Sequence, residues 1–96
     1  MIEIEVQQLQ QIAYRLLVHI IQNGGIRTVT LEKDFYWDIP LDQLYDVETT
    51  PELVMGSLND DWEFVSDLQA KDSDPVSVSL TELAPLLRYL GGKIGQ

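Results

Sequence analysis

The densest group of side chains that could do chemistry is an acidic cluster in the second half of the chain. Asp60, Asp61 and Glu63 lie almost together, and Asp67 follows one helical turn later. Carboxylate oxygens bind calcium and magnesium, and a metal held there could activate water for hydrolysis. The spacing of a calcium-binding loop is missing, however. We favour the alternative, in which these acids begin a helix and interact with the positive end of its dipole.

Histidine and cysteine chemistry is scarce in this chain. His19 is the single histidine, and there is no cysteine. A catalytic histidine needs an orienting carboxylate and a nucleophile within reach, and no motif such as G-x-S-x-G accompanies His19. The sequence therefore predicts a protein that is not an enzyme, with no catalytic residue, no cofactor and no bound metal. Metal-assisted hydrolysis through the acidic cluster is kept as a distant alternative.

A second cluster combines aromatic and acidic side chains around residues 35–46. Stacking on single-stranded nucleic acid needs positive charge beside the aromatic rings, whereas the charged neighbours here are acidic. Tyrosine and tryptophan often anchor protein interfaces, so acid-flanked aromatics suit a basic protein surface. The alternative is that these rings fill the core of the fold. The candidate partner-binding residues are Phe35, Tyr36, Trp37, Asp38, Asp42, Tyr45 and Asp46.

The charge distribution narrows the classes of partner. Sixteen acidic residues against six basic ones give a formal charge of -10. Residues 32–82 hold fourteen of the acids and only Lys33 and Lys71, which makes -12. Such a field repels phosphates and anionic lipids and attracts basic proteins, so we expect neither direct nucleic-acid binding nor membrane binding. The alternative is that the acidic surface serves only solubility.

Length and composition indicate one small globular domain. A chain of 96 residues with 45% hydrophobic residues can build one core, so we expect a single domain over 1–96. No apolar run is long enough to span a membrane, and the N-terminus lacks the pattern of a signal peptide. Together with the absence of cysteine, this favours a cytoplasmic location.

The apolar spacing predicts an α+β fold dominated by helices. Three main helices are expected at about 4–23, 59–70 and 81–91. Between the first two, a short β-hairpin or extended segment is expected over 26–39, with strands at 26–31 and 35–39. We expect these helices to share one core, made of Leu16, Leu17, Ile20, Trp62, Val65, Leu86, Leu87 and Leu90.

Proline and glycine residues set the expected boundaries. Pro40 can open a helical turn through Tyr45, and Thr50-Pro51 has the composition of another helix start. In the last helix, Ser79 could cap a start at Leu80, but Pro85 would then lie inside at a cost of about 3 kcal/mol. We favour a start at Thr81 or later, with Gly91-Gly92 as the stop.

The first helix has an unusually wide apolar arc. Tyr14 and Val18 extend it beyond what a small core needs. We therefore expect a homodimer through this helix, with Tyr14 and Val18 as the candidate dimer face. The alternative is a monomer in which the aromatic residues of the hairpin cover both side chains.

One stretch resembles a known kind of protein. The residues from Tyr36-Trp37-Asp38-Ile39-Pro40 to Gly56-Ser57-Leu58-Asn59-Asp60-Asp61-Trp62 are similar to small uncharacterised acidic domains of bacteria, which have no known function. The resemblance implies a bacterial origin and brings no site residues. From the charge and the aromatic cluster, the function expected is an acidic protein-interaction module of adaptor or regulatory type. The alternative is an immunity- or inhibitor-like protein that neutralises a basic partner.

Overall fold

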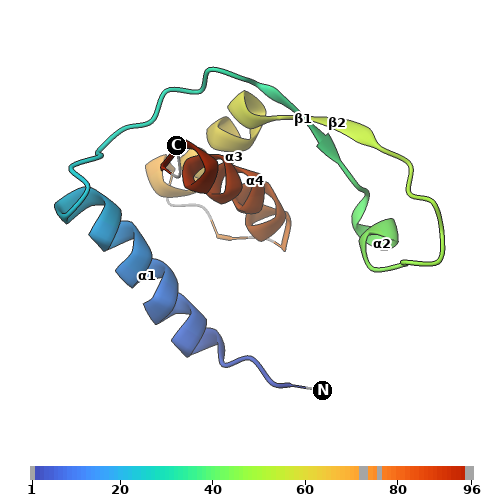
Figure 1. Cartoon of the computed structure of the whole chain (residues 1–96), viewed down its shortest axis with the longest axis horizontal. Helices are drawn as coiled ribbons and strands as arrows, with labels where there is room; N and C mark the ends of the chain where they lie inside the picture. The colour runs from blue at the N-terminus through green and yellow to red at the C-terminus, as the bar shows by residue number, and fades with distance from the viewer. Residues whose placement is uncertain (1, 72–73, 76, 95–96) are drawn as a thin grey trace. The chain divides into compact units, whose positions relative to one another are not determined.

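The structure, a computed structural model, describes residues 2–71, 74–75 and 77–94. The chain divides into two compact units, Met1–Thr30 and Leu31–Gln96, whose elements are drawn in Figure 1. The predicted class, α+β with helices predominant and a small antiparallel strand pair, is confirmed. The single domain expected over 1–96 stays a prediction. No helix of the described ranges is both long and apolar enough to cross a membrane.

The first unit is built around one helix. Helix α1 (Val6–Gln22) confirms the prediction of a helix at about 4–23. It stops at the predicted glycines, where Gly25 has a φ of 68° and the Ile26 N–H donates to the Ile20 carbonyl at 3.2 Å. A positive φ costs glycine no strain, so this residue can end the helix. No side chain of α1 is buried.

The second unit begins with a two-stranded sheet whose pairing differs from the prediction. Strand β1 (Phe35–Asp38) pairs antiparallel with β2 (Val54–Ser57), and residues 26–31, expected as its partner, form no strand. Helix α2 (Leu41–Leu44) is the predicted turn after Pro40. The helix expected from Thr50-Pro51 was a wrong prediction, because the chain passes instead into β2.

The register of the sheet explains why β2 forms at this place. Tyr36 lies opposite Gly56, and a Cβ atom built on Gly56 would overlap the Tyr36 ring. The glycine thus leaves room for an aromatic ring to cross the neighbouring strand. Cross-strand packing of this kind stabilises a strand pair whose local propensity is weak.

Helix α3 follows β2 with no residue between them. It runs from Leu58 to Ala70, which confirms the helix predicted at 59–70. Ser57 is its N-cap, and its Oγ accepts from the Asp60 N–H at 3.2 Å. Serine is a favourable capping residue, and the acids of the first turn suit the positive end of the helix, as the sequence predicts.

Helix α4 (Ser77–Ile94) is longer at both ends than predicted. The late start at Thr81 was wrong, because Pro85 lies inside the helix. Gly91 and Gly92 do not end the helix either. Packing can outweigh local propensity, and α4 packs along α3. Near its end, Tyr89 Oη accepts from the Glu32 N–H at 3.0 Å, and Lys93 pairs with Glu32 at 2.8 Å.

The buried core is smaller than expected and lies at the start of α3. Among the described residues, only Leu58, Asp61 and Ser79 are buried. The eight-residue core expected from the helical spacing is wrong, since four of its members are exposed. A short chain has too much surface for its volume to hide every apolar side chain. The exposed members are Leu16, Leu17, Trp62 and Leu87.

The ring over Gly56 gives a first testable prediction. Gly56→Ala should destabilise the second unit by about 1–3 kcal/mol, because the new methyl group must displace the Tyr36 ring. Gly91→Ala is the matched control, since nothing lies within 4 Å of a Cβ atom there. In a helix interior this change should stabilise by about 0.5–1 kcal/mol. Urea unfolding followed by circular dichroism measures both, and equal midpoints would contradict the packing.

Candidate protein-interaction surface

One side of the β1–β2 sheet carries large apolar side chains that are open to solvent. Alternate residues of a strand point to the same side. Phe35 and Trp37 therefore share a side, and their exposed fractions are 66% and 70%. Met55, which is opposite Trp37 in the register, is 63% exposed. We call Phe35, Trp37 and Met55 the aromatic face.

Tyr36 points the other way and has a different role. It is half-buried, and its hydroxyl donates to Asp61 Oδ2 at 2.7 Å. Burial raises the pKa of the Tyr36 phenol, and the hydrogen bond to the carboxylate raises it further. Tyr36 was a candidate for partner binding, but here it fastens β1 to α3. The strand alternation was a signal in the sequence for separating it from Phe35 and Trp37.

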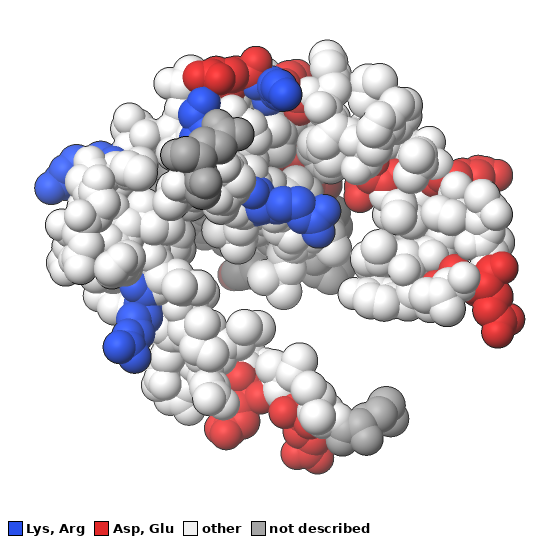
Figure 2. Space-filling model, in the orientation of Figure 1, with Lys and Arg blue, Asp and Glu red and all other residues white. Residues whose placement is uncertain are grey.

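The remaining candidate residues surround α2 and are exposed. The three aspartates among them form no ion pair within the described part of the chain, and residues 34–70 contain ten acids and no lysine, arginine or histidine. Figure 2 shows acidic side chains, and no basic one, over α2 and the loop that follows it. The ion pairs of the described residues join Lys71 to Asp67 and Lys93 to Glu32. The exposed candidates are Asp38, Asp42, Tyr45 and Asp46.

Hydrogen bonds within the loop between the strands hold these residues in place. The Gln43 amide oxygen accepts from the Glu52 N–H at 2.8 Å, which ties α2 to the stretch before β2. Asp46 Oδ2 accepts from the Thr49 hydroxyl at 2.6 Å. Such side-chain bonds to nearby groups are typical of ordered turns. The acids therefore stand on an ordered loop beside the sheet.

Asp34 connects the sheet to the start of α3. Its Oδ1 accepts from the Asn59 N–H at 2.8 Å and from the Ser57 hydroxyl at 2.9 Å, and its carbonyl accepts from the Leu58 N–H at 2.8 Å. The hydrogen bond from the Asn59 backbone is the main reason why the pKa of Asp34 is below its ordinary value. These bonds satisfy N–H groups that a helix start leaves unpaired.

The acidic cluster of residues 60–67 does not converge on one point. Asp61 is buried, whereas Asp60 and Glu63 are exposed and Asp67 pairs with Lys71 at 3.4 Å. Within the described ranges, no three His, Asp or Glu side chains are arranged to hold a metal ion. Asp61 instead lies close to Glu82 of α4 and raises the pKa of its carboxyl group. That contact was missed, because the sequence has no local signal that pairs residues on different helices.

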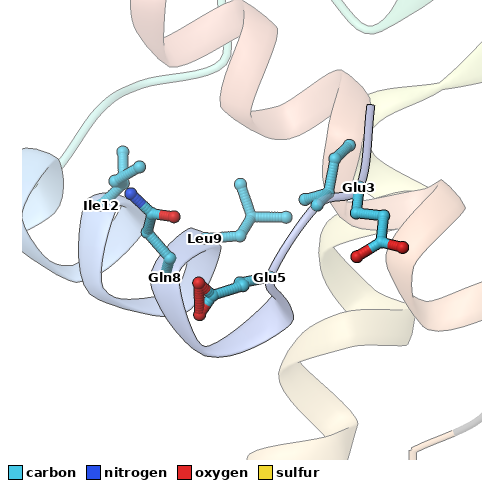
Figure 3. A pocket seen from close by; sticks show the side chains of 6 residues that line it. Glu3, Glu5, Gln8, Leu9 and Ile12 are labelled. Carbon is cyan, nitrogen blue, oxygen red and sulfur yellow. The ribbon is translucent and has the colours of Figure 1, made fainter. Parts of the chain in front are cut away.

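Two hollows were also missed. One, of about 630 Å³, lies along α3 and α4 and is mainly apolar. Its lining includes Trp62, Leu68, Leu80 and Leu83, of which the sequence predicts Trp62 as core. The other, of about 220 Å³, lies between the N-terminal segment and the first turns of α1, where Glu3, Glu5 and Gln8 surround Leu9 and Ile12 (Figure 3).

The candidate residues of α1 lie in the first unit. Tyr14 is 71% exposed and Val18 is half-buried. His19 is exposed.

No protein-family model, curated protein or solved structure matches this chain. The resemblance to bacterial acidic domains therefore stays a prediction.

The bonds to Asp34 predict how acid affects stability. The folded protein holds the pKa of Asp34 below its ordinary value of 3.8, so this carboxylate stabilises the fold above that pH. The contribution is lost as the pH falls through the lower folded value. Asp34→Asn should therefore reduce the fall in urea midpoint between about pH 6 and pH 3, whereas Asp42→Asn, on exposed α2, should leave it unchanged. An identical fall in wild type and Asp34→Asn would contradict this assignment.

Proposed function

We propose that this chain is a non-enzymatic, acidic protein-interaction module that binds a basic protein through the aromatic face and the acids around α2. The observation that supports it most strongly is the exposure of Phe35, Trp37 and Met55 on one side of the sheet. Three large apolar side chains left in water beside one another are typical of a contact surface. The cytoplasm is its proposed compartment, in keeping with a chain that has no cysteine.

The chemistry of the partner follows from the charge beside the aromatic face. Asp38, Asp42 and Asp46 have no ion-pair partner among the described residues. Acids around an apolar centre attract lysine and arginine, speed up association and make it sensitive to salt. Arginine also stacks on aromatic rings, so Trp37 and Phe35 can accept the same side chains that the acids attract.

Two roles are compatible with such a surface. The first is an adaptor or regulator that joins a basic protein to another component. The second is an inhibitor- or immunity-like protein that covers a basic active surface. The run of residues 34–70 without a basic side chain favours the second, because a polyanion-binding protein would be attracted to it. The two roles differ in whether the partner loses its activity when bound.

Binding measurements with matched tryptophan variants test the proposal. A partner captured from the source cells is identified, purified and titrated by calorimetry. Trp37→Ala should weaken binding by about 2 kcal/mol or more, roughly thirtyfold, because anchoring aromatics dominate interface energies. Trp62→Ala removes the other tryptophan, which is exposed on α3 outside the aromatic face, and should leave the affinity unchanged.

The dependence of binding on salt concentration tests the role of the acidic residues around α2. Asp42→Asn together with Asp46→Asn should lower the association rate and flatten its dependence on ionic strength, with little effect on dissociation. Equal affinity for wild type and Trp37→Ala would exclude the aromatic face. A loss of affinity in Trp62→Ala equal to that in Trp37→Ala would show that the partner also contacts α3. Loss of the partner's own activity on binding selects the inhibitor role over the adaptor role.

We also propose that the chain associates as a homodimer through α1. The apolar arc of α1 covers more than half of the helix circumference at about 100° per residue. Tyr14 is strongly exposed within this arc. Residues 1–31 carry no net charge, since Glu3 and Glu5 balance Arg15 and Arg27. Two copies of α1 can thus approach without electrostatic repulsion, and a symmetric contact would cover both arcs.

Sedimentation equilibrium at micromolar concentration tests the dimer. Wild type should give twice the mass of 11.0 kDa, and Tyr14→Glu should give the monomer mass because it places charge in the contact. Gln8→Glu adds the same charge on the polar side of α1, away from Tyr14 and Val18, and should remain a dimer. A wild-type monomer would refute the proposal, and a dimeric Tyr14→Glu variant would refute this face.

A further inference from the structure

The register of the sheet determines which backbone groups of β1 bond to β2 and which point away from it. The Leu58 N–H donates to the Asp34 carbonyl at 2.8 Å, so this pair, one step beyond the end of the sheet, is hydrogen-bonded. Hydrogen-bonded and non-hydrogen-bonded pairs alternate along antiparallel strands. The next hydrogen-bonded pair is therefore that of Tyr36. Phe35 and Trp37 belong to the other kind, and their N–H and carbonyl groups point away from β2.

This outer edge of β1 is open. Phe35 and Trp37 are strongly exposed, and no hydrogen bond joins their outward backbone groups to another segment of the described chain. A free edge is a template on which another chain can form a strand, and proteins usually protect it with lysine, proline or a bulge. β1 contains neither lysine nor proline, and its four residues pair with β2 without a bulge. The edge is thus unprotected.

The outer edge of β2 offers less. Its outward backbone groups belong to Met55 and Ser57, because these residues lie opposite Trp37 and Phe35. Ser57 is half-buried, its hydroxyl donates to Asp34 Oδ1 at 2.9 Å, and α3 starts at the next residue. An added strand would therefore find one open residue on β2 and two on β1.

The charge beside the edge of β1 selects the occupant. A second copy of the chain would bring the aspartates of its own β1 and α2, and like charges opposite one another destabilise a strand pair. A basic segment is attracted instead by Asp38, Asp42 and Asp46, which form no ion pair within the described residues. In an extended segment alternate side chains point to the same side, so arginines two positions apart can stack on Phe35 and Trp37.

We propose that the outer edge of β1 binds an extended, arginine-bearing segment of the basic partner, which joins the sheet as a third, antiparallel strand. Its backbone bonds to Phe35 and Trp37, and its alternate arginines lie over the aromatic face. Main-chain hydrogen bonds give affinity in this mode of recognition, and alternate side chains give specificity. The inference rests on the proposed function and adds to it the conformation in which the partner is bound.

A short peptide tests the added strand. The probe has seven residues, alternating arginine and valine with arginine at both ends, and its termini are acetylated and amidated. In an antiparallel strand with its arginines over the aromatic face, the arginine N–H groups point to β1 and the valine N–H groups point to solvent. Calorimetric titration should show binding at least about tenfold weaker when two arginine nitrogens are N-methylated. N-methylation of two valine nitrogens, the matched control, should change it by less than about twofold.

Amide hydrogen exchange measured by NMR locates the edge. In the free protein the Tyr36 amide should exchange slowly because it bonds within the sheet, whereas the amides of Phe35 and Trp37 should exchange fast. The peptide should slow exchange at Phe35 and Trp37 by at least about tenfold and leave Met55 unchanged. Protection of Met55 in their place would put the strand on β2 and overturn the choice of edge.

A proline variant tests the same edge from the side of the protein. Phe35→Pro and Phe35→Ala both remove the ring, but only proline also removes the N–H that points outward. Proline is tolerated at the first residue of a strand, and Phe35 has that position in β1. Phe35→Pro should bind the peptide about fivefold more weakly than Phe35→Ala, with a similar urea midpoint. If Phe35→Pro does not fold, the two methylated peptides decide.

Failure of the added strand is distinguishable from failure of the proposed function. Binding that is lost in Trp37→Ala but leaves the amides of Phe35 and Trp37 unprotected would keep the aromatic face and overturn the strand. Equal affinities of the unmodified and the arginine-methylated peptide, or no binding of the unmodified peptide at millimolar concentration, would overturn it as well. The proposed function is decided separately, by the effect of Trp37→Ala on the affinity for the captured partner.

Discussion

The unpaired N–H groups at the start of α3 are the constraint on which the second unit depends. Because β2 runs directly into α3, no loop is available to satisfy them, and acceptors must come from elsewhere in the chain. Ser57, the N-cap residue, supplies one acceptor with its hydroxyl oxygen. Asp34, the residue before β1, supplies two acceptors, its side-chain Oδ1 and its backbone carbonyl. This bonding fixes β1 beside α3, which brings Tyr36 to Asp61 and leaves Phe35 and Trp37 on the outer side of the sheet.

The same helix start explains where negative charge is tolerated. Acids that lie there are compensated by N–H groups, by the helix dipole or by a hydroxyl group, as Asp34, Asp60 and Asp61 are. Acids around α2 are exposed to water and have no ion-pair partner among the described residues. The molecule thus contains structural acids near α3 and uncommitted acids near the aromatic face, and the formal charge of -10 does not distinguish them.

How much the sequence predicts depends on the range of the interactions involved. Helices α1 and α3 were found because their apolar period and caps are local signals. The pairing of β1 with β2 was missed, because it rests on a tyrosine ring that crosses a glycine far along the chain. The start of α4 was predicted too late for a similar reason. Pro85 carries an energetic cost inside a helix, and the packing of α4 on α3 outweighs that cost. At the candidate surface, composition singled out Phe35 and Trp37 without deciding between partner binding and core filling, and it could not reveal the partner of Tyr36.

The direct passage from β2 into α3 also affects the order in which parts of the chain fold. Asp34 and Asn59 are joined by a hydrogen bond across the whole stretch that includes β1, α2 and β2. Closing such a loop carries an entropic cost that local helix formation does not. The middle and end of α3 can therefore form early, by contacts between near neighbours, whereas its first turn waits for the sheet. We therefore expect the beginning of this helix to be among the last parts of the chain to fold.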